Sequence, residues 1–177
     1  MIFQVEPQVT KNDIKAVSSY MESGGWLTEH KITEDFEKKI SKYVSRKYAV
    51  SVPNGTIAIY LSLVSLGVKK GDKVAVPNIT MIATINAIIW AGATPVLIDV
   101  DKDLCMSYSS LVKIKNLKAV IFVPLNGRKG EGESIRKWCK QNKVFLIEDS
   151  AHALGTEYDG VKAGNLGDLS VLSFTPH

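Results

Sequence analysis

Residues 144–155 read Val144-Phe145-Leu146-Ile147-Glu148-Asp149-Ser150-Ala151-His152-Ala153-Leu154-Gly155, a short apolar run followed by an acidic pair and a histidine. Such an apolar run is typical of a β-strand that is buried on both faces of a parallel sheet. In open α/β sheets, ligands bind at the carboxyl ends of the strands, which would place Asp149 at a binding site. An acid at this position can equally cap a helix, and the run alone favours neither interpretation.

The rest of the chain alternates between short Val/Ile/Leu runs and segments with helical periodicity. This alternation predicts an α/β fold, a three-layer α/β/α domain with a mostly parallel sheet. We expect an N-terminal arm in residues 1–30 and one domain in residues 31–177. The pattern predicts helices at 12–21, 33–43, 55–66, 80–90 and 133–141, and strands at 48–52, 73–77, 94–100, 119–124, 144–147 and 169–174.

The composition indicates a globular protein and narrows the classes of ligand. The 177 residues are 45% hydrophobic and 23% charged, with a net charge of +4. Basic residues are scattered, which weakly favours a small anionic ligand and disfavours nucleic acid. Two cysteines, Cys105 and Cys139, make no disulfide framework. Because no signal segment or membrane-length apolar stretch is visible, we expect a cytoplasmic protein.

A candidate phosphate-binding loop joins a predicted strand to a predicted helix at Ser51-Val52-Pro53-Asn54-Gly55-Thr56. Small residues there expose the first N–H groups of the helix, and these groups, with the helix dipole and the Thr56 hydroxyl, can hold a phosphate. An ordinary turn before a capped helix has the same pattern, so both interpretations stay open. The Walker-type and G-x-G-x-x-G phosphate loops are absent from the sequence, as is a zinc-type cluster.

A carboxylate in a cleft whose far end binds phosphate suits a cofactor with a phosphate at one end and a basic nitrogen at the other. Pyridoxal 5'-phosphate (PLP) has this form, and an aspartate beside its pyridine nitrogen keeps the ring protonated as an electron sink. Asp149 is the candidate for this role. Ser173, on the following predicted strand, could add a hydroxyl to the phosphate site, or could be an ordinary strand serine.

An ordered set of motifs over nearly the whole chain resembles the PLP-dependent sugar aminotransferases of the DegT/DnrJ/EryC1/StrS family. Each motif is ordinary by itself, whereas the ordered set is specific. The motifs are Gly25-Trp26-Leu27-Thr28, Asn54-Gly55-Thr56, Val76-Pro77-Asn78-Ile79-Thr80-Met81-Ile82-Ala83-Thr84-Ile85-Asn86-Ala87, Gly92-Ala93-Thr94-Pro95-Val96 with Asp99, Glu148-Asp149-Ser150-Ala151-His152, Gly167-Asp168 and Ser173-Phe174.

The resemblance implies a fold-type I aminotransferase large domain that works as a homodimer. The implied reaction moves an amino group from glutamate to the keto carbon of a sugar linked to a nucleotide diphosphate, with no nucleic acid or membrane as partner. Asp149 then faces the pyridine nitrogen and His152 the phenolic oxygen of the cofactor. The remaining implied contacts are Asn54, Gly55, Thr56 and Ser173 at the phosphate, Met81 over the ring, and Trp26, Leu27 and Thr28 near the sugar.

Two departures from the family pattern bear on the reaction. The usual H-L-Y-G is Pro124-Leu125-Asn126-Gly127 here, which removes an imidazole and a phenol. The family's Schiff-base lysine follows the serine matched by Ser173 by five residues, so we expect it immediately after His177, and no catalytic residue within the chain. A histidine there would instead indicate a nucleotide-sugar 3-dehydratase. A third alternative is a non-catalytic fragment that ends before the lysine and the small C-terminal domain.

Overall fold

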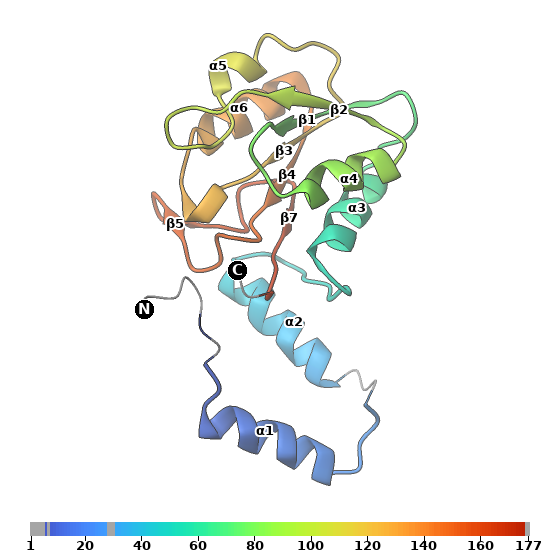
Figure 1. Cartoon of the computed structure of the whole chain (residues 1–177), viewed down its shortest axis with the longest axis vertical. Coiled ribbons are helices and arrows are strands. Elements are labelled where there is room, and N and C mark those ends of the chain that lie inside the picture. The colour runs from blue at the N-terminus through green and yellow to red at the C-terminus, as the bar shows by residue number, and fades with distance from the viewer. Residues whose placement is uncertain (1–5, 7, 28–30, 176–177) are drawn as a thin grey trace.

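The computed structural model describes residue 6, residues 8–27 and residues 31–175. Its centre is a five-stranded sheet whose neighbouring strands are all parallel, in the order β2-β1-β3-β4-β7 (Figure 1). The parallel pairing brings the carboxyl ends of these strands to one edge of the sheet, where ligands of such folds bind. The strands are β1 (Lys73–Pro77), β2 (Thr94–Ile98), β3 (Ala119–Phe122), β4 (Phe145–Asp149) and β7 (Leu169–Val171).

Helices cover both faces of this sheet and bury an apolar cluster against each. The helical elements are α1 (Lys11–Glu22), α2 (Lys31–Tyr43), α3 (Gly55–Ser65), α4 (Ile82–Trp90), α5 (Tyr108–Leu111), the 3-10 turn η1 (Leu125–Gly127) and α6 (Gly132–Asn142). One cluster joins α3 and α4 to strand residues such as Val74 and Ile147. The other joins α5 and α6 to residues such as Phe122 and Leu146. These layers confirm the predicted α/β/α class.

Strand β4 directs two buried carboxylates to opposite faces of the sheet. Successive side chains of a strand alternate between faces, and Leu146 and Ile147 belong to the two different clusters. The same alternation sends Glu148 to the α5 and α6 face and Asp149 to the α3 and α4 face. Both side chains are buried, so each needs its own polar partners.

The start of β7 is fixed to β4 by the Gly167-Asp168 motif. Asp168 donates its N–H to the Leu146 carbonyl at 2.7 Å, and its carboxylate accepts the Leu146 N–H at 2.8 Å. A Cβ on Gly167 would lie 2.6 Å from the Leu169 carbonyl oxygen and 2.7 Å from that of Leu146. No larger residue fits there, because both obstacles are backbone atoms. The motif therefore has a structural role, which sets the position of the chain that leads to Ser173.

The strand predicted at 48–52 is wrong. These residues form no strand, and Tyr48 and Val50 are 74% and 78% exposed. This segment and β7 both line a cavity of about 740 Å³, and the described part of the chain has no strand paired with residues 48–52. The segment therefore lacks the neighbouring strand whose backbone groups a ladder requires. The apolar pattern reports only a preference of the segment for extended backbone and carries no information about a partner strand.

A two-stranded hairpin that was not predicted follows β4. It consists of β5 (Glu157–Tyr158) and β6 (Val161–Lys162), which pair antiparallel. The turn residues Asp159 and Gly160 both have positive φ, 49° and 82°. Asp-Gly is the usual sequence of such a turn, so the signal was present in the sequence.

The N-terminal segment contributes little to the core. Thr10 and Asp13 form a reciprocal capping box at the start of α1. No residue of α1 is buried, and Ile14, Val17 and Met21 are each more than half exposed. In Figure 1 this helix stands apart from the sheet. In the part of the chain that the structure describes, no helix has the length and apolar character needed to cross a membrane.

Candidate functional site

The amino end of α3 presents unpaired backbone donors at the carboxyl edge of the sheet. Asn54 caps the helix, since its side-chain oxygen accepts the Ile57 N–H at 3.0 Å. The N–H groups of Gly55 and Thr56 lie in the first turn, where no intrahelical acceptor exists. With the positive end of the helix dipole, they form a place where an anion can bind. The structure thus confirms the predicted helix start at Gly55. Asn54 caps one N–H group of the first turn, and the N–H groups of Gly55 and Thr56 have no acceptor within the helix.

Gly55 and Ser173 lie side by side although they are far apart in sequence. A Cβ on Gly55 would lie 3.7 Å from the Ser173 Cβ and 3.9 Å from its Oγ. Ser173 follows β7, and its Oγ accepts the Thr175 N–H at 3.3 Å. Asn54, Gly55 and Ser173 line one end of the 740 Å³ cavity. The absence of a side chain on Gly55 therefore leaves a small cradle between the helix and the serine hydroxyl.

Asp149 is a buried carboxylate on the same face of the sheet. Its exposed fraction is 4%, and Oδ2 accepts the Thr84 hydroxyl at 2.9 Å. Oδ1 accepts the Ala151 N–H at a longer 3.4 Å. Burial raises the pKa of Asp149, while the Thr84 hydrogen bond, the Ala151 N–H and the charge of His152 oppose that rise. Asp149 thus offers a buried carboxylate whose ionised form a cationic ligand would stabilise.

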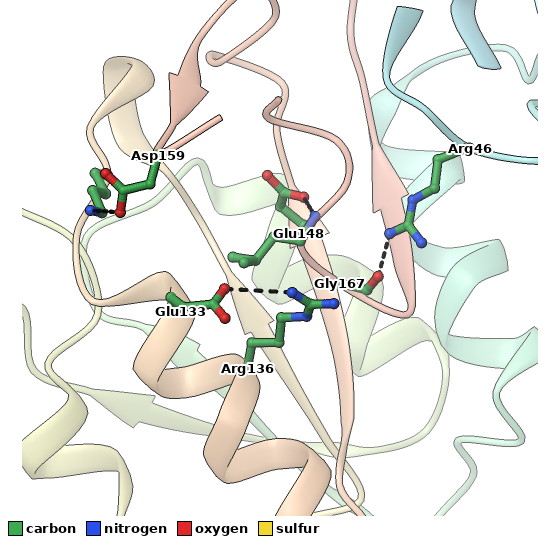
Figure 2. Close-up of polar contacts among 8 residues, drawn as sticks. Arg46, Glu133, Arg136, Glu148, Asp159 and Gly167 are labelled. Atoms are coloured by element: carbon green, nitrogen blue, oxygen red, sulfur yellow. Dashed lines mark hydrogen bonds and ion pairs between the residues drawn. The ribbon is translucent and has the colours of Figure 1, made fainter. Parts of the chain in front are cut away.

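Glu148, on the opposite face, holds together the loop that precedes β7. Its carboxylate accepts the N–H groups of Gly164 at 3.0 Å and Leu166 at 2.8 Å, and the Ser170 hydroxyl at 3.2 Å. Arg46 crosses to the same loop and donates to the carbonyl of Gly164 and to that of Gly167 (Figure 2). Burial lowers the pKa of Arg46, against the opposing charges of Glu148 and Asp168. This network explains why Glu148, the first acid of the pair, has a structural role.

The other residues named from the sequence are less enclosed. Met81 stands at the N-cap position of α4 and is 59% exposed. His152 is half-buried just beyond β4 and acts electrostatically on Asp149. Trp26 and Leu27 are exposed, and Thr28 lies outside the described residues. The roles of these residues toward a cofactor or sugar stay predictions.

Sequence reasoning missed three residues that shape the site: Thr84, Glu148 as an anchor, and Arg46. Thr84 is fully buried on α4, within a motif that the sequence singled out without assigning it a role. Its spacing from Asp149 gives no signal, because the two meet only through the packing of α4 on β4. Gly55 and Ser173 line the cavity, whereas Asp149, which is buried on the same face of the sheet, is not among its lining residues.

The chain matches several known proteins over nearly its whole length. A GDP-perosamine synthase from Vibrio cholerae is 34% identical over 177 residues, which is 98% of this chain and 48% of that protein. The solved aminotransferase from Psychrobacter cryohalolentis matches with a TM-score of 0.90 and 30% identity, over 98% of this chain and 45% of that one. A putative sugar aminotransferase from Streptococcus pneumoniae, Spr1654, has been solved in PLP and PMP forms. It matches with a TM-score of 0.85 and 32% identity, over 96% of this chain and 47% of that one.

The chain therefore spans about half the length of the relatives it matches. The structural neighbours share the parallel sheet and helical layers, which fits a fold-type I aminotransferase large domain. The model of one family matches residues 7–177. On this match, the chain belongs to the DegT/DnrJ/EryC1/StrS aminotransferase family.

Proposed function

We propose that this chain forms the cofactor-binding part of a PLP-dependent enzyme that transfers an amino group from glutamate to a keto sugar linked to a nucleotide diphosphate. Membership of an aminotransferase family supports the transfer. The similarity to the GDP-perosamine synthase from Vibrio cholerae supports a nucleotide-linked sugar. The PLP and PMP forms of the Streptococcus pneumoniae protein support the cofactor.

The buried carboxylate of Asp149 is the observation that carries the proposal. A negative charge at 4% exposure is unfavourable unless a cation or strong donors compensate it. The protonated pyridine nitrogen of PLP is such a cation, and the donors of Gly55, Thr56 and Ser173 suit its phosphate. The chemistry of these residues therefore suits PLP at both of its ends.

When bound, PLP supplies an electron sink for the carbon that loses a proton. Asp149 would hold a proton on the ring nitrogen, and the first turn of α3 would bind the phosphate and orient the ring. Met81 would pack on the ring and His152 would contact the phenolic oxygen. Trp26, Leu27 and Thr28 would lie near the sugar, with residues 1–30 as the arm and residues 31–177 as the cofactor domain.

Two further elements complete the proposal. The lysine that binds the cofactor is proposed at the position after His177. A homodimer is supported by apolar side chains on the outer side of α4, where Ile82, Ile89 and Trp90 are each more than half exposed. A cytoplasmic location is supported by Cys105 and Cys139, which are both free and buried.

Turnover of the full-length enzyme with glutamate and nucleotide-linked keto sugars tests the proposal. Asp149→Asn should still bind PLP, though more weakly, and at saturating PLP should lower turnover by about a hundredfold or more, equivalent to about 2.7 kcal/mol of transition-state stabilisation. Asp159→Asn is the matched control, because Asp159 is exposed and pairs with Lys129 on the hairpin. Near-normal turnover of Asp149→Asn would contradict the role of Asp149, and release of no 2-oxoglutarate would contradict glutamate as donor.

A further inference from the structure

Two threonine hydroxyls lead from the beginning of α4 to Asp149. The Thr84 hydroxyl lies 2.9 Å from Oδ2 of Asp149, and the Thr80 hydroxyl lies 3.1 Å from that of Thr84. Thr84 is fully buried, and Asp149 is nearly so. A buried hydrogen bond to a carboxylate is stronger than one exposed to water. The contact is therefore placed where it can affect the state of the carboxylate.

The ionisation state of Asp149 decides which hydroxyl donates and which accepts in this pair of hydrogen bonds. Thr84 has one hydroxyl proton, and an ionised Asp149 can only accept, so that proton goes to Oδ2. The Thr80 hydroxyl must then donate to Thr84. A hydroxyl that accepts one hydrogen bond becomes a stronger donor in the next. The Thr80 hydroxyl therefore strengthens the hydrogen bond from Thr84 to the carboxylate.

The hydrogen bonds of Asp149 are divided unevenly between its two oxygens. Oδ2 accepts the Thr84 hydroxyl, whereas within the described part of the chain Oδ1 accepts only the longer hydrogen bond from the Ala151 N–H. The titratable groups that act on Asp149 are His152, beyond the strand, and Glu148, its neighbour on β4. From α4, Thr84 contacts Asp149 through its hydroxyl. From β7, the residue paired with Asp149 in the strand register is Val171, which is uncharged. Oδ1 is thus the oxygen better able to take another donor.

We propose that Thr84 is a positioning residue that keeps Asp149 ionised and leaves Oδ1 available for the ring nitrogen of the cofactor. The identity of that ligand rests on the proposed function. The effect of Thr84 on Asp149 does not, because both residues belong to the described fold and their contact is present without a ligand. Thr84 touches neither substrate nor cofactor in this arrangement and acts through Asp149.

The first test is a carbon-13 NMR titration of the aspartate carboxyl groups in the full-length enzyme freed of cofactor. The Asp149 signal is the one that Asp149→Asn removes. Thr84→Val keeps the side-chain shape without the hydroxyl, and should raise the pKa of Asp149 by about one to two units. Thr84→Ser keeps the hydroxyl, and should stay within about 0.5 unit of the wild type. Thr84→Ala replaces the valine variant if that variant does not fold.

The second test compares binding of PLP with binding of 1-deazapyridoxal phosphate, in which a C–H replaces the ring nitrogen. Thr84→Val should weaken PLP binding by about tenfold, the factor that corresponds to one pKa unit, and leave binding of the analogue unchanged. A role in packing alone would weaken both ligands equally. Thr80→Val, which removes only the outer hydroxyl, should give a smaller effect of the same kind.

An unchanged Asp149 pKa in Thr84→Val, or equal shifts in the valine and serine variants, overturns the inference. Equal weakening of both ligands also overturns it. A wild-type enzyme that binds PLP and the deaza analogue equally contradicts the proposed function instead. In that case the carboxyl titration alone decides whether Thr84 controls Asp149.

Discussion

Replacing Glu148 by glutamine tests how firmly one buried carboxylate holds the loop before β7. The carboxylate accepts two backbone N–H groups, from Gly164 and Leu166, and the Ser170 hydroxyl. Glutamine has one acceptor oxygen, so its NH₂ group would face one of these N–H donors. The variant thus leaves donors unpaired in a fully buried position.

The expected cost follows from these contacts. A buried donor without an acceptor costs about 1–3 kcal/mol, and exchanging a charged for a neutral acceptor adds about 1 kcal/mol. Arg46 also loses the negative charge that acts most strongly on its guanidinium group. We expect the free energy of unfolding to fall by about 3 kcal/mol, a large share of the roughly 5–15 kcal/mol that is usual for a domain.

Urea unfolding followed by circular dichroism measures this loss. With a slope of about 2 kcal/mol per molar urea, the midpoint should fall by about 1.5 M. Glu133→Gln is the matched control, because Glu133 pairs with Arg136 at 3.6 Å on the exposed side of α6 (Figure 2). Such a surface pair contributes under about 0.5 kcal/mol. A Glu148→Gln midpoint no lower than that of Glu133→Gln would refute the reasoning.

Two further predictions concern the candidate site. Because burial raises the pKa of Asp149, its ionisation costs folding stability above the ordinary aspartate pKa of about 4. Without cofactor, Asp149→Asn should therefore be more stable than the wild type at pH 7, and this difference in stability should vanish below about pH 4. Thermal unfolding across pH measures the difference. A variant that is less stable than the wild type at pH 7 would count against the reasoning. In Gly55→Ala, the added Cβ would lie 3.7 Å from Ser173, an ordinary contact, and alanine favours a helix by about 1 kcal/mol over glycine. The melting temperature of Gly55→Ala should equal or exceed that of the wild type. Its affinity for PLP, measured by titration calorimetry, should fall by about tenfold or more. An unchanged affinity would mean that the cradle does not receive the phosphate.

The elements that the sequence predicted well are those decided by local patterns. The continuous apolar runs at 73–77 and 144–147 became β1 and β4 because both faces of the sheet are covered. The Asn54 cap was predictable because the N–H group that its side-chain oxygen accepts lies only three residues away, at Ile57.

What the sequence could not show depends on partners distant in the chain. Residues 48–52 have a strand-like composition, but no neighbouring strand pairs with them across the cavity at β7. Thr84 meets Asp149 across 65 positions, and Arg46 meets Gly164 across 118. Glu148 and Asp149 are adjacent and chemically alike, and only the alternation of β4 between two faces separates an anchor from a candidate cofactor contact.

The nitrogen-15 shift of the pyridine ring measures the contact on which the proposed site depends. PLP labelled at its ring nitrogen would be bound to the full-length enzyme and to Asp149→Asn. A buried carboxylate beside the nitrogen predicts a protonated ring in the wild type at neutral pH and an unprotonated ring in the variant. A wild-type shift that shows an unprotonated ring, or the same shift in both proteins, would contradict the assignment of Asp149 to the cofactor.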